Sequence, residues 1–147
     1  MTDPSRTLVV RKTIAATPER LFAAWTEPAA LRQWWGPEGV TCIDPQVDLR
    51  VGGRYRIGNR LSDGSILWII GEFEAVEPPH RLVYTWHLES GAESTERVTV
   101  RFEGHGSVTE VIVTHALIAT EMLRDQHRHG WEGCLEGLGR YAASTHQ

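Results

Sequence analysis

Six strand-like runs follow one another in the second part of the sequence, with only short connections between them. The runs comprise residues 41–49, 52–61, 66–77, 80–89, 94–103 and 108–117. Turn-forming pairs such as Asp63-Gly64, Pro78-Pro79 and Ser90-Gly91 separate them. Tight turns join antiparallel strands, whereas parallel strands need long crossover connections. This part of the chain is therefore predicted to form an antiparallel meander.

One face of this sheet is predicted to be apolar. Successive side chains of a strand point to opposite faces, so residues two apart share a face. The three later runs each place three apolar or aromatic-type side chains on one face: Leu82, Tyr84 and Trp86; Val98, Val100 and Phe102; Val111, Val113 and His115. Such a face must be covered by another element.

Residues 120–144 are predicted to form the covering helix, with about five to six turns. Its apolar stripe comprises Leu123, His127, Trp131, Cys134, Leu135, Leu138 and Ala142. Gly130, Gly133 and Gly137 fall on one edge of that stripe, although each glycine costs roughly 1 kcal/mol relative to alanine inside a helix. Either backbone packs closely against this edge, or the glycines leave space for a ligand.

The first forty residues are predicted to contain one strand and two short helices. The strand covers residues 6–14, and a helix follows that Thr17 can cap and Pro18 can begin. Pro28 then starts a second helix, which ends in two adjacent tryptophans before Gly36-Pro37. Trp34 is predicted to pack on the body of the domain. Trp35 then points elsewhere, either to staple this segment to a neighbour or to form part of a cavity rim.

Composition bounds the classes of function. The length of 147 residues fits a single domain covering residues 1–147, and the net charge of −4 argues against nucleic acid as a partner. No apolar run approaches a membrane span, and no export signal is visible, so we expect a cytoplasmic protein. Cys42 and Cys134 stand far apart and are interpreted as small apolar residues.

Several blocks of the sequence together carry a resemblance to a known family. They are Thr17-Pro18-Glu19 with Leu21 and Trp25, the segments TEPAALRQWWGP, VDLRVGGRYR, GEFEAVEPPHRLVYTW and VTVRFEGHGSVTEVIVTH, and Gly130-Trp131 with Leu135, Leu138 and Tyr141. The chain resembles the START-like superfamily (SRPBCC), which includes polyketide cyclases and lipid-transport proteins. More narrowly, it is similar to bacterial homologues of the activator of the heat-shock-protein-ninety ATPase.

This resemblance implies an α+β helix-grip fold. In that fold, two short helices follow the first strand, and a long C-terminal helix packs across the concave face of a curved seven-stranded antiparallel sheet. It also implies a hydrophobic cavity between helix and sheet, and binding of a small hydrophobic or aromatic molecule for sensing, sequestration or transport. The alternatives are a cyclase or hydrolase on the same fold, and a stress-response co-regulator of a chaperone ATPase. The eukaryotic activators carry a separate N-terminal domain that docks on the chaperone, and 147 residues leave no room for it, so the resemblance gives little support for a chaperone partner.

The candidate ligand-binding residues follow from the inward-facing positions and the helix stripe. They are Trp35, Tyr55, Trp68, Tyr84, Trp86, Val100, Phe102, Val113, His115, Leu123, His127, Trp131 and Cys134. His115 and His127 are the candidates for acid–base catalysis, against the alternative that each is a core histidine bonded to backbone. Glu72 and Glu74 share a face and could form a carboxylate pair, although a solvated sheet face explains them as well.

The expected partners are few. The sequence contains no nucleophile elbow and no zinc-ligand spacing, so we expect no covalent catalysis, no metal and no cofactor. We expect a small hydrophobic ligand as the partner, and neither nucleic acid nor membrane. An exposed sheet edge or aromatic surface could pair two copies into a homodimer.

Overall fold

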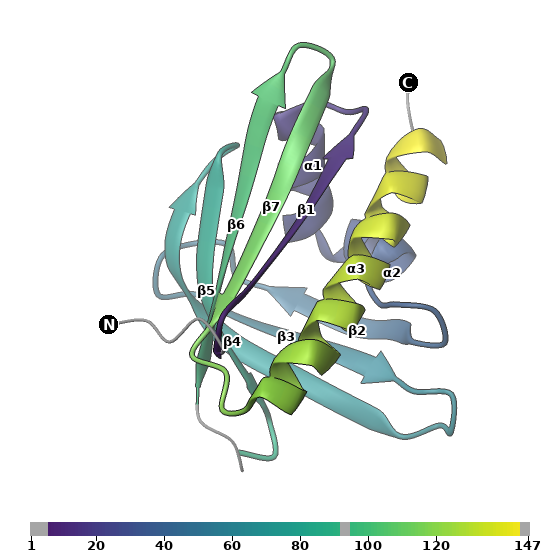
Figure 1. Ribbon diagram of the computed structural model, residues 1–147, viewed down its shortest axis with the longest axis vertical. Helices are drawn as coiled ribbons and strands as arrows, with labels where there is room; N and C mark the ends of the chain where they lie inside the picture. The colour runs from purple at the N-terminus through teal and green to yellow at the C-terminus, as the bar shows by residue number, and fades with distance from the viewer. Residues whose placement is uncertain (1–5, 92–94, 145–147) are drawn as a thin grey trace.

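A computed structural model describes residues 6–91 and 95–144 of the chain. The elements follow one another as β1 (Leu8–Ile14), α1 (Pro18–Thr26), α2 (Pro28–Trp34), β2 (Thr41–Val47), β3 (Arg54–Arg60), β4 (Ile66–Glu77), β5 (Arg81–Leu88), β6 (Glu96–His105), β7 (Val108–Ala116) and α3 (Glu121–Ser144). The sheet curls around α3, which runs across its concave face (Figure 1). The predicted α+β helix-grip fold is confirmed.

The seven strands form one antiparallel sheet in the order β1-β7-β6-β5-β4-β3-β2. Each strand from β2 to β6 therefore pairs with its successor along the chain, as the short turns predicted, and β1 adds to the far edge beside β7. The predicted fifth run begins at Ser94, which lies outside the described residues; β6 itself begins at Glu96. None of the helices in the described part of the chain could span a lipid bilayer.

The two short helices begin and end where the sequence indicates. The Thr17 side chain accepts a hydrogen bond from the Arg20 backbone N–H at 3.2 Å, which satisfies one of the free donors at the start of α1. Pro28 occupies the first turn of α2, and Glu27 caps both helices through its backbone. α1 and α2 close one end of the curved sheet beside α3 (Figure 1).

The three glycines on one edge of α3 have different surroundings. A Cβ added at Gly137 would lie 2.7 Å from the backbone oxygen of Trp34, and one added at Gly133 would lie 2.6 Å from Cβ of Pro37. A Cβ at Gly130 would meet nothing within 4 Å. The close-packing explanation is therefore confirmed for the C-terminal half of α3, which packs against α2 and the loop after it. Beside Gly130 the space is open, and its use by a ligand stays a prediction.

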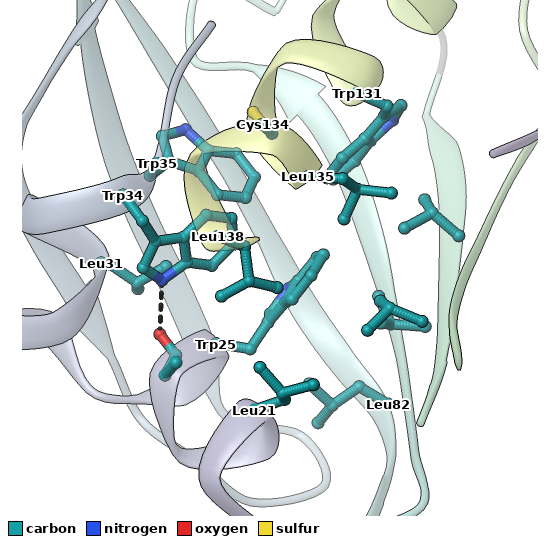
Figure 2. Close-up of a cluster of buried hydrophobic side chains, with 14 of the residues drawn as sticks. Leu21, Trp25, Leu31, Trp34, Trp35, Leu82, Trp131, Cys134, Leu135 and Leu138 are labelled. Carbon is teal, nitrogen blue, oxygen red and sulfur yellow. Dashed lines mark hydrogen bonds between the residues drawn. The ribbon is translucent and has the colours of Figure 1, made fainter. Parts of the chain in front are cut away.

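Five tryptophans form the centre of the core. This indole cluster comprises Trp25, Trp34, Trp35, Trp86 and Trp131, with ring centroids of contacting pairs 4.9–6.4 Å apart. Figure 2 shows four of the rings, which come from α1, the end of α2 and α3, with Cys134, Leu135 and Leu138 of α3 beside them. The fifth ring, Trp86, comes from β5. Trp34 donates its indole N–H to the Ala24 carbonyl at 2.9 Å. α2 is thereby tied to α1.

Candidate functional site

A cavity of about 360 Å³ lies between the N-terminal half of α3 and strands β3 to β6. Its wall is formed mainly by aliphatic and aromatic side chains. The described residues that line it are Pro37, Val40, Asn59, Leu67, Ile69, Trp86, His87, Leu88, Glu96, Leu123, Gln126, His127, Gly130, Trp131 and Cys134. The open space beside Gly130 belongs to this cavity.

One wall of the cavity contains a buried carboxylate with two imidazoles. The Glu96 Oε1 atom lies 2.7 Å from His115 Nε2 and 3.0 Å from His127 Nε2. The two imidazole rings stack, with centroids 4.3 Å apart. Glu96 and His115 are almost fully buried, and the side chain of His127 is 19% exposed. We call these three residues the carboxylate–imidazole cluster.

Strand register and helix spacing bring this cluster together. Glu96 pairs with Trp86 across β5 and β6, and Val98 pairs with His115 across β6 and β7. Glu96 and His115 are therefore diagonal neighbours on the concave face, within reach of long side chains. His127 lies on α3 one turn before Trp131, so both point toward the same region of the sheet.

A hydrogen bond from Trp131 fixes the tautomer of His115. The indole Nε1 of Trp131 lies 3.0 Å from His115 Nδ1. Since an indole nitrogen can only donate, His115 Nδ1 must accept and carries no proton. The ring proton is then on Nε2, which donates to Glu96. His115 is therefore a neutral imidazole, held between a tryptophan donor and a carboxylate acceptor.

Burial and these hydrogen bonds shift two pKa values. Burial alone raises the pKa of the Glu96 carboxyl, but the hydrogen bonds from His115 and His127 outweigh it and lower that pKa to about 2. Burial lowers the pKa of His115 below its ordinary 6.5, and the hydrogen bond to Glu96 offsets this only in part. At neutral pH the cavity wall therefore contains an ionised carboxylate beside a neutral imidazole.

The same cluster has the composition of a metal site, but its hydrogen bonds favour a different role. The ligand atoms of Glu96, His115 and His127 lie within 4.8 Å of one another. A metal on His115 Nε2 would require the ring proton on Nδ1, where it would face the N–H of Trp131. Metal-bound histidines normally donate from their second nitrogen, and here that nitrogen accepts. The geometry supports a hydrogen-bonded network.

The cluster predicts that the protein loses stability in acid in two stages. Unfolded His115 takes up a proton near pH 6.5 and the folded residue does not, so the free energy of unfolding should fall as pH drops below about 6.5. Glu96 stabilises the fold above pH 4.5, and this contribution should be lost between pH 4.5 and about 2.

Urea unfolding at a series of pH values measures both stages, and the imidazole ¹⁵N signals identify the tautomer. His115 should keep a protonated Nε2 at pH 5. A His115 ring that is doubly protonated at that pH would contradict the assignment. The Glu96→Gln variant is the control, because it should lack the second stage.

Five of the thirteen predicted site residues line the cavity: Trp86, Leu123, His127, Trp131 and Cys134. Their contact with a ligand stays a prediction. His115 does not line the cavity, but it contacts the lining residues Glu96 and His127. The other predicted residues lie outside the described lining: Trp35, Tyr55, Trp68, Tyr84, Val100, Phe102 and Val113.

Different physical reasons place these residues elsewhere. Trp68 lies on the opposite face of β4 from the lining residues Leu67 and Ile69, and the Arg56 guanidinium sits 3.6 Å above its ring centroid. Tyr55 and Tyr84 line a void of only about 20 Å³. The Tyr84 hydroxyl accepts a hydrogen bond from the Trp25 indole, and burial raises the pKa of that hydroxyl.

The remaining residues belong to the packed core. Val100, Phe102 and Val113 are buried near α1, where Phe22 contacts Phe102 edge-on with ring centroids 5.7 Å apart. Trp35 is 5% exposed and lies behind the cavity wall, in contact with the two lining tryptophans. Its place is in the indole cluster, and its indole N–H donates to Asn59, so the structure favours the staple interpretation. A contact of Trp35 with a ligand stays a prediction.

The most important polar residue of the wall, Glu96, was missed by the sequence reasoning. It stands two positions before Val98, so it shares the inward-facing parity of Val98, Val100 and Phe102. An acidic residue at an inward position of an apolar strand was the available signal. Glu72 and Glu74, by contrast, are exposed, and Glu74 forms an ion pair with Arg97 at 2.7 Å.

The two cysteines lie in surroundings that favour the protonated thiol. Both are free and buried. Burial raises the pKa of Cys42 to about 11 and that of Cys134 to about 12. A thiol with such a pKa is protonated at neutral pH and is a poor nucleophile. Both residues therefore act as small apolar side chains, as predicted.

Most of the chain matches the model of a known family. The family model for Activator of Hsp90 ATPase homolog 1-like proteins (AHSA1) matches residues 15–143. The chain belongs to this family. The AHSA1 match begins directly after β1 and includes every residue that lines the cavity. No curated protein sequence matches the chain significantly.

Solved structures of other AHSA1-like proteins share the fold. An AHSA1 protein from Silicibacter pomeroyi is 26% identical, with a TM-score of 0.85, and the match covers 95% of this chain and 99% of that one. CalU16 from Micromonospora echinospora is 28% identical, with a TM-score of 0.72 and coverage of 96% and 80%. An HSP90 activator from Plasmodium falciparum is 25% identical, with a TM-score of 0.69 and coverage of 90% and 93%.

Proposed function

We propose that this protein binds a small, mostly apolar molecule in the cavity between α3 and the sheet, for sensing, sequestration or transport. The cavity itself is the observation that carries the proposal. Its volume of about 360 Å³ falls within the range of small-molecule sites. Its wall combines aromatic and aliphatic side chains with few polar groups, which is the usual composition of such sites.

A ligand panel tests this function. Aromatic polyketides, flavonoids, sterols and fatty acids should include at least one compound that raises the melting temperature and quenches tryptophan emission. A ligand that binds only the folded state at a concentration of one hundred times its Kd stabilises it by about 2.7 kcal/mol. Trp86 and Trp131 line the cavity, so a bound molecule would contact two emitters.

Gly130 offers a matched pair of variants that localises binding. Because a Cβ at this position meets nothing within 4 Å, Gly130→Leu should fold and place an isobutyl group in the cavity. That variant should lose the stabilisation by ligand, whereas Gly130→Ala, which adds one methyl group, should keep most of it. Equal ligand stabilisation of the Leu variant and the unchanged protein would place the site elsewhere and overturn the proposal.

Acid–base catalysis is a second candidate, because an ionised carboxylate and an imidazole stand together at the cavity wall. His127 is the residue that would exchange protons with a substrate, since it lines the cavity and His115 is enclosed. His127→Gln should then abolish turnover of a substrate found in the panel while the melting temperature changes little. Unchanged turnover in this variant would exclude the role.

A chaperone-linked role is a third candidate, favoured by the likeness to the Plasmodium activator. It predicts that the purified chain stimulates ATP hydrolysis by an HSP90-type chaperone from the same cell. The rate with and without the chain, at saturating ATP, measures this directly. No increase at a several-fold molar excess of the chain would end this candidate.

A further inference from the structure

The carboxylate of Glu96 has one oxygen engaged and one available. Oε1 accepts from both His115 and His127. No residue in the ranges 6–91 and 95–144 donates a hydrogen bond to Oε2. Glu96 is only 4% exposed and lines the cavity. Oε2 is not among the buried side-chain atoms that lack a partner, so it faces the open cavity, where a donor of an entering molecule can reach it.

No lysine or arginine side chain balances the charge of the wall. Neither lysine nor arginine occurs among the described residues that line the cavity. His115 is held neutral by the donor N–H of Trp131. When His127 is neutral as well, the wall bears a full negative charge inside an apolar enclosure. Buried charges in proteins are normally paired, so this wall is complementary to a cation.

Aromatic rings stand beside the carboxylate. Trp86 pairs with Glu96 across the strands, and its ring centroid lies 5.5 Å from that of Trp131. Both indoles line the cavity with Glu96. Tryptophan faces attract cations through their quadrupole, and the attraction grows when water is excluded. A cation at Glu96 would therefore be favoured by two kinds of interaction.

We propose that the ligand of this cavity is a lipophilic amine: an apolar or aromatic body with a protonated nitrogen that donates to Glu96 Oε2. The body lies against Trp86, Trp131, Leu67 and Leu123. This inference rests on the proposed binding function and specifies the class of molecule bound. It disfavours fatty acids and other carboxylates, because they would bring a second negative charge to a buried carboxylate.

Three naphthalene probes of nearly equal shape test the inference: 2-naphthylmethylamine, 2-naphthalenemethanol and 2-naphthoic acid. Titration calorimetry of the full chain at pH 8 is suitable, because an ordinary imidazole is then neutral and an alkylamine is still protonated. The amine should bind at least about tenfold more tightly than the alcohol, as expected for a charge-assisted hydrogen bond to a buried carboxylate. The acid should bind more weakly than either.

The Gly130→Leu and Glu96→Gln variants identify the site and the group. Gly130→Leu should abolish binding of the amine, which excludes nonspecific attraction to the net negative chain. Glu96→Gln should reduce amine affinity about tenfold and leave the affinity for the alcohol within about twofold. If Glu96→Gln fails to fold, the comparison of the three probes on the unchanged protein still tests the amine inference.

The outcomes separate this inference from the proposed function. If the alcohol or the acid binds as tightly as the amine and Gly130→Leu abolishes both, the amine inference is overturned and cavity binding stands. If the amine binds best but Gly130→Leu leaves it unaffected, the site is elsewhere and the inference is also overturned. Failure of all three probes to bind overturns the amine inference, and the ligand panel then decides separately on the proposed function.

Discussion

Replacing Trp35 by alanine is expected to lower the free energy of unfolding by about 3–5 kcal/mol, the usual cost of removing a buried aromatic side chain. Trp35 contacts four other indoles of the cluster, with centroids 5.5–6.4 Å away. Its indole N–H donates to the Asn59 side chain at 3.0 Å, and that donor would be lost too. Urea unfolding followed by far-ultraviolet circular dichroism measures the change.

Trp35→Phe is the matched control. It keeps an aromatic ring in the cluster and loses the hydrogen bond to Asn59, so it should cost far less than alanine. Both variants should still bind a cavity ligand where they remain folded, because Trp35 lies behind the wall. A Trp35→Ala protein with nearly unchanged stability and no ligand binding would contradict this placement and indicate that Trp35 lines the cavity.

Replacing Gly137 by alanine is the second change with a large expected effect. The added Cβ would lie 2.7 Å from the Trp34 backbone oxygen, and backbone atoms cannot rotate away as a flexible side chain can. Either α3 or α2 must shift, and overpacking of this kind typically costs about 1–3 kcal/mol. The helix propensity gained by alanine, about 1 kcal/mol, offsets part of this cost, so the net loss of stability should be up to about 2 kcal/mol.

Gly130→Ala provides the control in the same helix. Its Cβ meets nothing within 4 Å, so only the helix propensity changes and the free energy of unfolding should rise by up to about 1 kcal/mol. Thermal and urea unfolding of the two variants should therefore change in opposite directions. Two equal changes of the same sign would show that Gly137 does not make the close contact described.

The sequence predicts that these glycines share a helix edge, but it cannot assign their separate roles. Helical spacing places Gly130, Gly133 and Gly137 on one side. What stands opposite each one depends on where α2 ends and how the following loop returns to β2. That is a tertiary property, and no local pattern contains it. The fold class was easier to predict, because turns and alternating side chains fix an antiparallel meander locally.

The candidate site was predicted in part for a similar reason. Parity on the strands and spacing on α3 correctly bring Trp86, His127 and Trp131 to the covered face. Parity does not say how far along the strands the cavity extends, so Val100, Phe102 and Val113 were included although they lie in packed core. Glu96 was missed because it has no second carboxylate or histidine near it in the sequence, and its two imidazole partners come from β7 and α3.

The indole cluster also determines what the tryptophan fluorescence of this protein can report. Excitation energy transfers readily between indole rings whose centroids are 4.9–6.2 Å apart. We therefore expect the five clustered tryptophans to share their excited state before any of them emits. A molecule that contacts one ring can then quench the emission of all five. Trp68 lies beneath Arg56 on the opposite face of β4, outside the cluster, and can serve as an internal reference. The molecule thus carries a sensitive optical probe that reports occupancy of the whole cluster rather than the position of the occupant.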